Sequence, residues 1–570
     1  MNNKKWVLMY KDHRAEDVLK LSQELNLPPV IATVILNRGI SDPESFIHPT
    51  EDALLDPFLM LGMEKATERI LRALEDHEKI VIYGDYDVDG ITSTAIMVRF
   101  LRSHNADVTY YIPDRLEEGY GINLAAIDKL AAQGVSLLIT VDCGITAVNE
   151  IEYAKTKGIE TIITDHHECK DEIPDAYCLL NPKQPECPYP FKKLAGVGVA
   201  FKLLQALTIK MRFHMRELIE SYCDLVAIGT VADVMQLVGE NRVVVKKGLE
   251  LLRYTMNKGI RALADVAEID LSNVQTGTIG FMIAPRINAA GRMGDPRCAV
   301  ELLLATDEMT AKRYAEQLNC ENIERQETES SIMEEAISLI ENTPSFENDY
   351  VLVLSHDGWH HGIIGIVASK LSERFHKPCI LISTDEETGK GSGRSIRTFN
   401  LFKALEHCQD LLLKFGGHDL AAGLSIHPDK IEEFRETINA YAKETLTEDD
   451  FTPILYIDSE LPPEYINMNT AERLSILEPY GMGNACPRFF ARNLTVVQTR
   501  ALSDGKHIKL TLRSGDHYFD AVGFNMGELN KELHIDDMID IAFDLDINTY
   551  RGSRQLQVLL KDVKKSEIPH

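Results

Sequence analysis

Residues 79–94, KIVIYGDYDVDGITST, decide how the surrounding chain folds. They open with Ile80-Val81-Ile82-Tyr83, an apolar and mostly β-branched run that is typical of a buried strand. Three carboxylates follow at alternate positions, Asp85, Asp87 and Asp89. Gly90 is expected to close a turn, and Thr92-Ser93-Thr94 is expected to cap a helix that runs to about His104.

The three neighbouring carboxylates repel one another, and this repulsion destabilises the loop unless a positive charge lies between them. Divalent cations are the usual solution, and sites rich in oxygen ligands suit Mg²⁺ or Mn²⁺. A solvated acidic turn is the alternative. The close junction with a buried strand favours the metal site.

Short apolar strands alternate with amphipathic helices beyond this stretch. The expected strands are residues 80–83, 108–112, 137–141, 160–164 and 177–180. The expected helices are residues 92–104, 123–133 and 147–157. This alternation predicts an α/β fold with a parallel sheet, and such sheets bind ligands at the carboxyl ends of their strands.

Acidic residues and histidines follow two more of these strands. Asp142 comes directly after residues 137–141, and Asp165-His166-His167 comes directly after residues 160–164. Because adjacent histidines point apart, one can ligate a metal while the other contacts substrate. A lone aspartate such as Asp142 is more often a helix N-cap. Asp233 ends an apolar helical stretch, where a carboxylate is metal-bound, ion-paired or a helix cap.

The composition bounds the class of protein. The chain has 570 residues, enough for several domains, and its net charge of −28 opposes nucleic-acid binding by bulk attraction. A nuclease with a local basic groove is still compatible with this charge. We find no apolar run of membrane-spanning length and no signal peptide, so no membrane partner is expected. Ten cysteines without a C-x-x-C pair favour a reducing compartment, and the cytoplasm is predicted.

Changes of pattern divide the chain into five segments. We expect a helical N-terminal extension at 1–75, the parallel-sheet domain at 76–300 and a helical connector at 301–345. A second α/β domain is expected at 346–450 and a small β-barrel at 452–570. The barrel strands are expected at residues 494–500, 507–512, 518–524, 538–548 and 555–561.

Three further stretches carry groups that can bind phosphate. Residues 285–294, PRINAAGRMG, place Arg286, Asn288 and Arg292 in a loop of small residues, where an arginine clamps phosphate or forms a surface ion pair. Residues 389–395, GKGSGRS, and 415–423, FGGHDLAAG, are interpreted as glycine-rich turns. Such turns let backbone N–H groups approach an anion, although most glycine-rich turns have no ligand.

Together these motifs resemble the DHH phosphoesterase superfamily, which is named after the triplet seen here as Asp165-His166-His167. Residues 112–121 and 285–294 make the chain similar to the RecJ family of single-strand-specific DNA exonucleases, and this resemblance covers about residues 75–565. Residues 346–450 resemble the DHHA1 substrate-binding domain, and the barrel resembles an OB-fold. Many members have a histidine where this chain has Tyr83, which makes Asp85 the replacement ligand by resemblance.

The resemblance implies a site for two divalent cations, Mn²⁺ or Mg²⁺. The implied metal ligands are Asp85, Asp87, Asp89, Asp142, His166 and Asp233, with Asp142 bridging. The implied catalytic residues are Asp142, His167 and Arg292. The implied nucleic-acid and phosphate contacts are Arg115, Arg286, Asn288, Arg292, His361, Ser392, Arg394, Ser395 and His418. Arg115, Ser392 and Arg394 are expected to form a pocket for a terminal 5′ phosphate.

The implied function is exonucleolytic hydrolysis of single-stranded DNA from 5′ to 3′, in DNA repair and recombination. A single-strand-binding protein and a helicase are implied as partners. A phosphodiesterase for short oligonucleotides or cyclic dinucleotides is the alternative, and a catalytically inactive scaffold is the third hypothesis. In the barrel, the residues expected to line a strand-binding groove are Lys506, His507, Lys509, Arg513, Tyr550, Arg551 and Arg554, unless the barrel only packs.

Overall fold

The computed structural model describes residues 4–9, 13–115, 118–119, 121–385, 387–550 and 553–566. The chain divides into two compact units, and each is described by itself. The parallel-sheet unit comprises His48–Glu327 and Pro479–Ala485. The second unit comprises Met1–Ile47, Thr328–Glu478 and Cys486–His570. It is called the two-sheet unit here after its two larger sheets, a mixed sheet and a barrel. Among the described helices, we find none that combines the length and the apolar character needed to cross a membrane.

A parallel sheet forms the centre of the parallel-sheet unit, as predicted. Its strands are β2 (Lys79–Gly84), β3 (Asp107–Tyr111), β4 (Leu137–Val141), β5 (Glu160–Thr164) and β6 (Cys178–Leu180). Their order in the sheet is β3-β2-β4-β5-β6, and all neighbours are parallel. Gly84 pairs with Val141, and Val141 pairs with Thr164. The residues that follow β2, β4 and β5 therefore emerge side by side at one edge.

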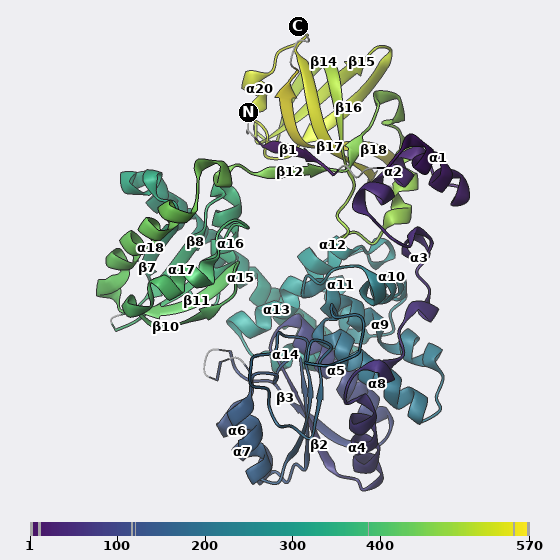
Figure 1. Cartoon of the computed structure of the whole chain (residues 1–570), viewed down its shortest axis with the longest axis vertical. Helices are drawn as coiled ribbons and strands as arrows, with labels where there is room; N and C mark the ends of the chain where they lie inside the picture. The colour runs from purple at the N-terminus through teal and green to yellow at the C-terminus, as the bar shows by residue number, and fades with distance from the viewer. Residues whose placement is uncertain are drawn as a thin grey trace. The chain divides into compact units, whose positions relative to one another are not determined.

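Helices cover both faces of this sheet (Figure 1). The helices on one face are α4 (Met63–Glu75), α5 (Val88–Ser103) and α8 (Gly196–Lys210), and those on the other are α6 (Leu124–Ala132) and α7 (Val148–Thr156). Ile80 and Ile82 of β2 pack toward the first face, and Val81 and Tyr83 toward the second. Burial on both faces explains why β2 is apolar without interruption.

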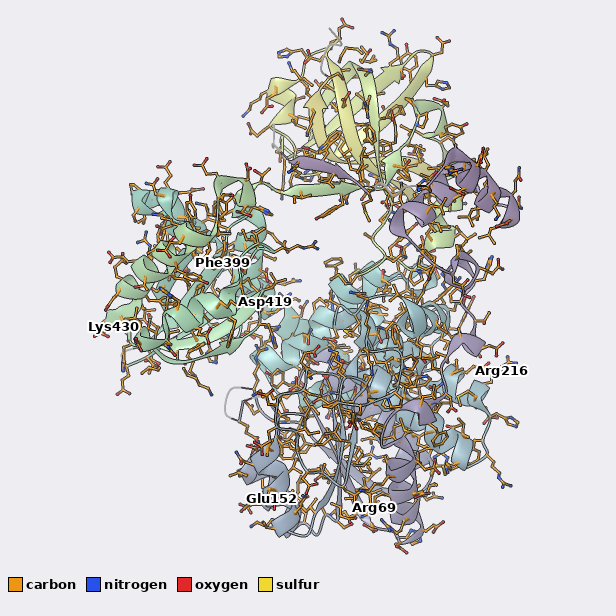
Figure 2. All side chains as sticks on the ribbon, in the orientation of Figure 1. Arg69, Glu152, Arg216, Phe399, Asp419 and Lys430 are labelled. Atoms are coloured by element: carbon orange, nitrogen blue, oxygen red, sulfur yellow. The ribbon has the colours of Figure 1, made fainter. Side chains whose placement is uncertain are left out.

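Arg69 of α4 ties the amino ends of two strands together (Figure 2). Its buried guanidinium lies 2.7 Å from Glu78, next to the start of β2, and also pairs with Glu160 at the start of β5. The pair lies at the edge of the sheet opposite to the acidic loops. The ion pairs of Arg69 therefore stabilise the sheet and lie away from the predicted site.

The predicted start of the first helix is wrong. α5 begins at Val88, with Asp87 as its N-cap and the Asp87 carboxylate accepting the Gly90 N–H at 3.0 Å. Aspartate is a strong N-cap, so the helix starts before Thr92-Ser93-Thr94. The Thr92 hydroxyl instead donates to the Val88 carbonyl at 2.7 Å. Asp89 is consequently held in the first turn of α5 and does not lie in a free loop.

Residues 285–293 also differ from the expected loop. They belong to α13 (Ala284–Met293), which follows a π-helical turn at Ile279–Ile283. Its small residues serve close packing, since a Cβ on Gly291 would lie 2.9 Å from the Tyr86 carbonyl oxygen. α9 (Met215–Ala232) ends at Asp233, its C-cap. The predicted connector is confirmed as α15 (Glu308–Asn342), and the boundary between the two units falls within it.

A mixed sheet forms one part of the two-sheet unit. Its strands are β7 (Leu352–Asp357), β8 (Cys379–Thr384), β9 (Gly389–Arg394), β10 (Leu412–Gly417) and β11 (Ala421–Ile426). Their order is β10-β11-β9-β8-β7, with β7 and β8 parallel and the other pairs antiparallel. The principal helices of this part are α16 (Ile364–Phe375), α17 (Leu401–His407) and α18 (Ile431–Thr445).

The interpretation of residues 389–395 and 415–423 as turns is wrong, because most of them form β9, β10 and β11. The alternating glycines of β9 face closely packed side chains. A Cβ would lie 2.9 Å from Ile382 at Gly389, 2.8 Å from Leu424 at Gly391 and 2.8 Å from Leu401 at Gly393. Since successive strand residues face opposite sides, Lys390, Ser392 and Arg394 share the other face.

The predicted C-terminal barrel is confirmed. Its strands are β14 (Arg488–Leu502), β15 (His507–Ser514), β16 (His517–Gly523), β17 (Met538–Tyr550) and β18 (Ser553–Lys565). β14 pairs with both β15 and β17, which closes the barrel.

The N-terminal segment is mainly helical, as expected, but it also contains a strand and is divided between the two units. It starts with β1 (Lys5–Leu8), which pairs with β12 (Ile454–Ile457), before α1 (Ala15–Glu24) and α2 (Pro29–Arg38). Trp6 donates its indole N–H to Asp562 at 2.7 Å, and Arg38 pairs with Asp458 at 2.7 Å. These long-range contacts assign the chain up to Ile47 to the two-sheet unit, whereas residues 48–75 belong to the parallel-sheet unit.

Candidate metal centre

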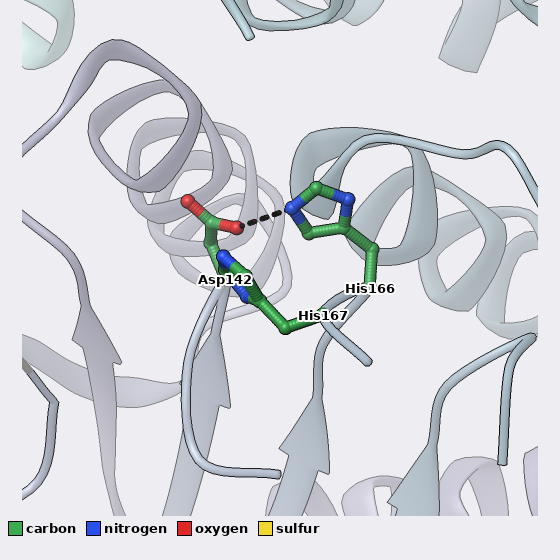
Figure 3. A group of neighbouring side chains, drawn as sticks. All are labelled: Asp142, His166 and His167. Atoms are coloured by element: carbon green, nitrogen blue, oxygen red, sulfur yellow. Dashed lines mark ion pairs between the residues drawn. The ribbon is translucent and has the colours of Figure 1, made fainter. Parts of the chain in front are cut away.

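The loops after β2, β4 and β5, together with the end of α9, bring acids and histidines together. Their ligand atoms form three groups, each within 4.8 Å. The groups are Asp85, Asp87 and Asp142; Asp142, His166 and His167 (Figure 3); and Asp89, His166 and Asp233. Asp142 and His166 each belong to two groups, so the three form one acid–histidine cluster. All six predicted metal ligands lie in it.

His166 occupies the middle of the cluster. Its Nε2 lies 3.2 Å from Asp142 Oδ1, 3.6 Å from Asp233 Oδ2 and 3.9 Å from Asp89 Oδ2. Burial, and after it the charge of His167, lowers the pKa of His166 to about 4. Neutral imidazole is the form that ligates metal ions. When its lone pair is on Nε2, the ring faces carboxylate oxygens, and a cation between them stabilises this arrangement.

The carboxylates lead to the same conclusion. Burial raises the pKa of Asp85, Asp89 and Asp142 well above the usual range, and the charges of neighbouring aspartates add to this effect. Burial, and then Asp87, raises the pKa of Asp233 to about 7. Among the described residues, buried Asp85 Oδ1 and Asp233 Oδ2 accept no hydrogen bond. This set of oxygen and nitrogen ligands fits divalent cations such as Mn²⁺ and Mg²⁺.

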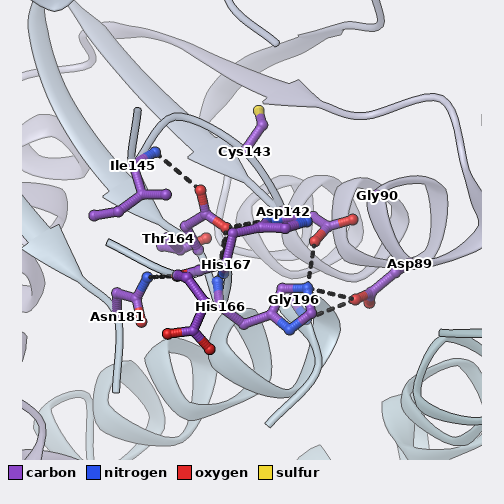
Figure 4. A network of polar contacts seen from close by, with 12 residues as sticks. Asp89, Gly90, Asp142, Cys143, Ile145, Thr164, His166, His167, Asn181 and Gly196 are labelled. Carbon is purple, nitrogen blue, oxygen red and sulfur yellow. Dashed lines mark hydrogen bonds and ion pairs between the residues drawn. The ribbon is translucent and has the colours of Figure 1, made fainter. Parts of the chain in front are cut away.

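The backbone around Asp142 and Asp89 is arranged to aim their side chains. Asp142 has a φ of 60°, a left-handed conformation that costs about 1–3 kcal/mol for a non-glycine residue. A Cβ on Gly196, the first residue of α8, would lie 2.5 Å from Asp142 Oδ1, so glycine is required there. The Gly196 N–H donates to Asp89 at 2.6 Å (Figure 4). The Val197 N–H donates to the same carboxylate at 2.7 Å.

Asp165 is a residue of the site to which the sequence analysis assigned no role. Its Oδ1 accepts hydrogen bonds from His167 Nδ1 at 2.7 Å and from the backbone N–H groups of His166 and His167. Its Oδ2 accepts from the Ile145 N–H at 2.9 Å (Figure 4). Burial works against protonation of His167, but the contact with Asp165 prevails and raises the pKa of His167. The only sequence signal for this role is its place in the triplet.

Three of the predicted phosphate-contacting residues adjoin the acidic loop at Tyr86. The Arg115 guanidinium lies 5.2 Å from the centre of the Tyr86 ring. The side-chain oxygen of Asn288 in α13 accepts a hydrogen bond from the Val88 N–H at 3.1 Å. The positive charge of Arg292 works to lower the pKa of the Tyr86 hydroxyl, against the larger effect of burial.

Two other residues point elsewhere. Arg286 donates to Asn319 of α15 at 2.9 Å and to the Met282 carbonyl at 2.7 Å. Tyr83 packs with α6 and α7, where its hydroxyl donates to the Gly121 carbonyl at 3.0 Å. Tyr83 therefore does not take the place of the histidine found in many relatives.

The remaining predicted contacts belong to the two-sheet unit. Ser392 accepts from Arg394 Nη1 at 3.2 Å, and a Cβ on Gly365 of α16 would lie 2.8 Å from Ser392 Oγ. Ser395 donates to the Phe399 carbonyl at 2.7 Å, which places it in a structural turn. The rings of His361 and His360 stack at 5.6 Å, and His418 is exposed in the β10–β11 turn. The pocket for a terminal 5′ phosphate, which Ser392 and Arg394 were expected to form with Arg115, stays a prediction.

The predicted groove residues of the barrel are only partly available for a ligand. Lys506 and Arg513 are exposed. Lys509 pairs with Asp520 at 2.7 Å, and Arg554 pairs with Glu472 at 3.0 Å. His507 packs edge-on against Phe524, with ring centres 5.2 Å apart. Arg551 and the side chain of Tyr550 lie outside the described residues.

Comparisons with known proteins agree with this arrangement. Residues 79–230 match the N-terminal domain of the DHH family, residues 348–444 match the DHHA1 domain, and residues 457–562 match the RecJ OB domain. The chain is 41% identical to the single-stranded-DNA-specific exonuclease RecJ of Bacillus subtilis (strain 168), over 99% of this chain and 71% of that protein. It is 34% identical to RecJ of Escherichia coli (strain K12), over 94% of this chain and 96% of that protein.

Solved structures give the same result. The crystal structure of RecJ from Thermus thermophilus in complex with Mn²⁺ has a TM-score of 0.86 and 29% identity, over 100% of this chain and 81% of that chain. A structure of the same protein in complex with Mg²⁺ has a TM-score of 0.79, also at 29% identity, over 99% of this chain and 79% of that chain. The acid–histidine cluster and the three matched domains lead to one assignment: the chain belongs to the RecJ family of DHH phosphoesterases.

Proposed function

We propose that this chain is a single-stranded-DNA-specific exonuclease that hydrolyses phosphodiester bonds with two divalent cations, Mn²⁺ or Mg²⁺. The observation that carries the proposal is the acid–histidine cluster, in which Asp142 and His166 join three groups of candidate ligands. Relatives named as such exonucleases, which match nearly the whole chain, support the choice of substrate.

The cluster offers ligands for both cations. Asp85, Asp87 and Asp142 would hold one, and Asp89, His166 and Asp233 would hold the other. Asp142 is the candidate bridge because it also lies 3.2 Å from His166. When bound, the cations activate water as the nucleophile and neutralise charge on the phosphate.

The residues around the cluster would bind and orient the DNA backbone. Arg115 and Arg292 lie close to Tyr86, and a guanidinium can donate two parallel hydrogen bonds to one phosphate. Asp165 accepts from Nδ1 of His167, which keeps the proton on that nitrogen. Nε2 of His167 is then available to a phosphate or leaving-group oxygen.

A direct test is the digestion of a long, labelled single strand by the full chain with Mn²⁺, with EDTA as control. We expect stepwise loss of nucleotides with Mn²⁺, no loss with EDTA, and little digestion of a blunt duplex. Hydrolysis of dinucleotides without digestion of the long strand would refute the exonuclease in favour of the short-oligonucleotide phosphodiesterase. Persistent hydrolysis in EDTA would refute the metal site.

We expect Arg394→Ala to reduce the preference for 5′-phosphorylated over 5′-hydroxyl strands about tenfold, since a charge-assisted hydrogen bond contributes about 1.5–3 kcal/mol. Arg394 shares a face of β9 with Ser392 and Lys390, and Gly365 of α16 approaches this face. The measurement is kcat/KM for the two strands. Arg397→Ala, an exposed arginine nearby, is the control and should keep the preference. An unchanged ratio in Arg394→Ala would rule out the 5′-phosphate pocket and with it the basis for a 5′ to 3′ direction.

Metal affinity should increase with pH. The raised pKa values of Asp85, Asp89, Asp142 and Asp233 mean that the metal-free protein holds protons that a cation must displace. Each displaced proton changes affinity about tenfold per pH unit below the raised pKa, and the part of the effect that comes from Asp233 ends near its pKa of about 7. Calorimetric titration with Mn²⁺ in two buffers of different ionisation enthalpy measures the released protons. Proton-independent binding would contradict this prediction.

Roles in DNA repair and recombination, and partnership with a single-strand-binding protein and a helicase, follow only from the family resemblance. The cytoplasmic location follows only from the cysteine pattern. All of these stay predictions. The barrel is proposed to hold the strand through exposed cations such as Lys506 and Arg513.

A further inference from the structure

We propose that Pro479–Ala485, here called the brace loop, is a positioning element that holds Asp233 in the metal centre. The loop reads PYGMGNA and lies 246 residues after Asp233 in the chain. It belongs to the parallel-sheet unit, although the chain on both sides of it, up to Glu478 and from Cys486, belongs to the other unit. The inference rests on the proposed role of Asp233 as a metal ligand.

The backbone that carries Asp233 is strained and is not held by its own side chains. Val234, the next residue, has a φ of 55°, a left-handed conformation that is strongly disfavoured for a β-branched residue. Its side chain is 66% exposed, so packing does not stabilise this conformation. Backbone hydrogen bonds from the Asp233 and Met235 N–H groups to the Gly229 and Thr230 carbonyls, at 2.9 and 3.2 Å, hold this turn to α9. The contacts of the following residues, Gln236 and Leu237, fix the direction that the chain takes beyond the turn.

Some of those contacts are made with the brace loop, while Gln236 also accepts hydrogen bonds from Lys193 at 2.6 Å and from the Asn241 amide at 3.1 Å. The Leu237 N–H donates to the Met482 carbonyl at 2.8 Å. A Cβ on Gly481 would lie 2.7 Å from Leu237 Cδ1, and a Cβ on Gly483 would lie 3.1 Å from Gln236 Cβ. Both glycines are thus in contact with the segment after Asp233, and a larger residue at either position would displace it.

The brace loop is itself rigidly held. Gly481 and Asn484 exchange two backbone hydrogen bonds, at 2.9 and 3.1 Å, and the buried Asn484 amide donates to the Pro479 carbonyl at 2.9 Å. Buried Arg242 also donates to the Pro479 carbonyl, at 3.3 Å, and Thr276 donates to the Tyr480 carbonyl at 2.5 Å. A loop so tightly bonded transmits its position to Leu237.

Displacement of the loop should therefore affect one cation more than the other. Asp233 shares its group with Asp89 and His166, whereas Asp85, Asp87 and Asp142 form the other group without it. Asp89 is fixed independently by the N–H groups of α8. The brace loop thus tunes the affinity of the cation held by Asp89, His166 and Asp233.

The test uses Gly483→Val in the full chain, because Gly483 has a φ of 74° and faces Gln236. We expect calorimetric titration with Mn²⁺ to show one site weakened about 10–100-fold and the other unchanged. At saturating single-stranded DNA, excess Mn²⁺ should restore most of the lost kcat. Gly134→Val is the matched control, since Gly134 has a φ of 73° and no atom within 4 Å of its added Cβ, so Mn²⁺ binding should stay as in the wild type.

Two reference variants separate the outcomes. Gly481→Ala adds a single methyl group against Leu237, the neighbouring contact of the same loop, and it keeps the test valid if Gly483→Val does not fold. Asp233→Asn should lose the cation held by Asp89, His166 and Asp233. If Asp233→Asn binds both cations normally, the proposed metal ligands are wrong. If Asp233→Asn loses a cation while both glycine variants bind as the wild type does, or if Gly134→Val is weakened equally, the brace loop has no positioning role.

Discussion

Asp142→Asn should abolish measurable exonuclease activity, with kcat reduced on the order of 10³-fold or more, because a metal-dependent hydrolysis loses several kcal/mol of transition-state stabilisation with its bridging carboxylate. Asp142 belongs to two of the three groups of candidate ligands, so both cations should be affected. Asp142→Ala should give the same loss. The measurement is single-turnover digestion of a labelled strand at several Mn²⁺ concentrations, where excess Mn²⁺ should not rescue the variant.

The same substitution should have the opposite effect on the stability of the metal-free protein. Burial, followed by repulsion from Asp89, Asp87, Asp85 and Asp233, raises the pKa of Asp142, which means that its charge destabilises the metal-free fold. A neutral amide removes that repulsion, so the thermal midpoint in EDTA should rise while the increase produced by Mn²⁺ becomes smaller. Loss of function together with a gain of metal-free stability is typical of residues selected for a site.

A control and a contradicting result make this prediction specific. Asp224 is also fully buried, but it accepts hydrogen bonds from Thr255 and the Leu225 N–H outside the cluster. Asp224→Asn should lower stability and leave the Mn²⁺ dependence of kcat unchanged. Full activity of Asp142→Asn in Mn²⁺ would refute the assignment of the metal centre.

The cluster could be predicted from the sequence because it depends on a simple rule of parallel sheets. β2, β4 and β5 are adjacent and in register, so residues that directly follow each strand must meet at one edge. The β-branched runs and the acids after them are local features of the sequence. Asp233 lies outside this rule. Its place at an apolar helical stretch left three roles open, and only the resemblance to known motifs implied the role of metal ligand.

Other features could not be predicted, because they depend on contacts between distant parts of the chain. The alternating glycines of β9 have low strand propensity and resemble turns, yet close packing against Leu401 and Leu424 requires them in a strand. The small residues of α13 were interpreted as a loop, but Gly291 lets that helix approach Tyr86. Neither the sequence around Leu237 nor the sequence around Met482 indicates that these two residues are in contact.

Asp165→Asn should lower kcat about 10²-fold, the usual effect of removing the carboxylate that orients a functional histidine. Asp165 accepts three hydrogen bonds at Oδ1 and one at Oδ2. An asparagine must place its NH₂ group against one of these donors. If the carbonyl keeps the contacts with His166 and His167, the NH₂ group faces the Ile145 N–H, and the loop after β4 is pushed away from its position.

The loss should appear in the chemical step and not in metal binding. Without the carboxylate, the pKa of His167 falls, because the charge of Asp165 is what opposes the effect of burial on this ring. The population with a proton on Nδ1 and a fixed ring orientation is then smaller, while the His166 ring keeps its place among Asp89, Asp142 and Asp233. We therefore expect Mn²⁺ affinity and the KM for DNA to stay within about threefold of the wild type, well below the effect of losing a ligand.

The comparison with His167→Ala decides whether Asp165 acts through this histidine. If it does, the double variant should lose no more activity than His167→Ala alone, since residues that act as one unit are not additive. Asp224→Asn again controls for a buried carboxylate lost elsewhere in the unit. Additive losses in the double variant would show that Asp165 acts mainly on the Ile145 loop, and an unchanged kcat in Asp165→Asn would show that His167 needs no orienting carboxylate.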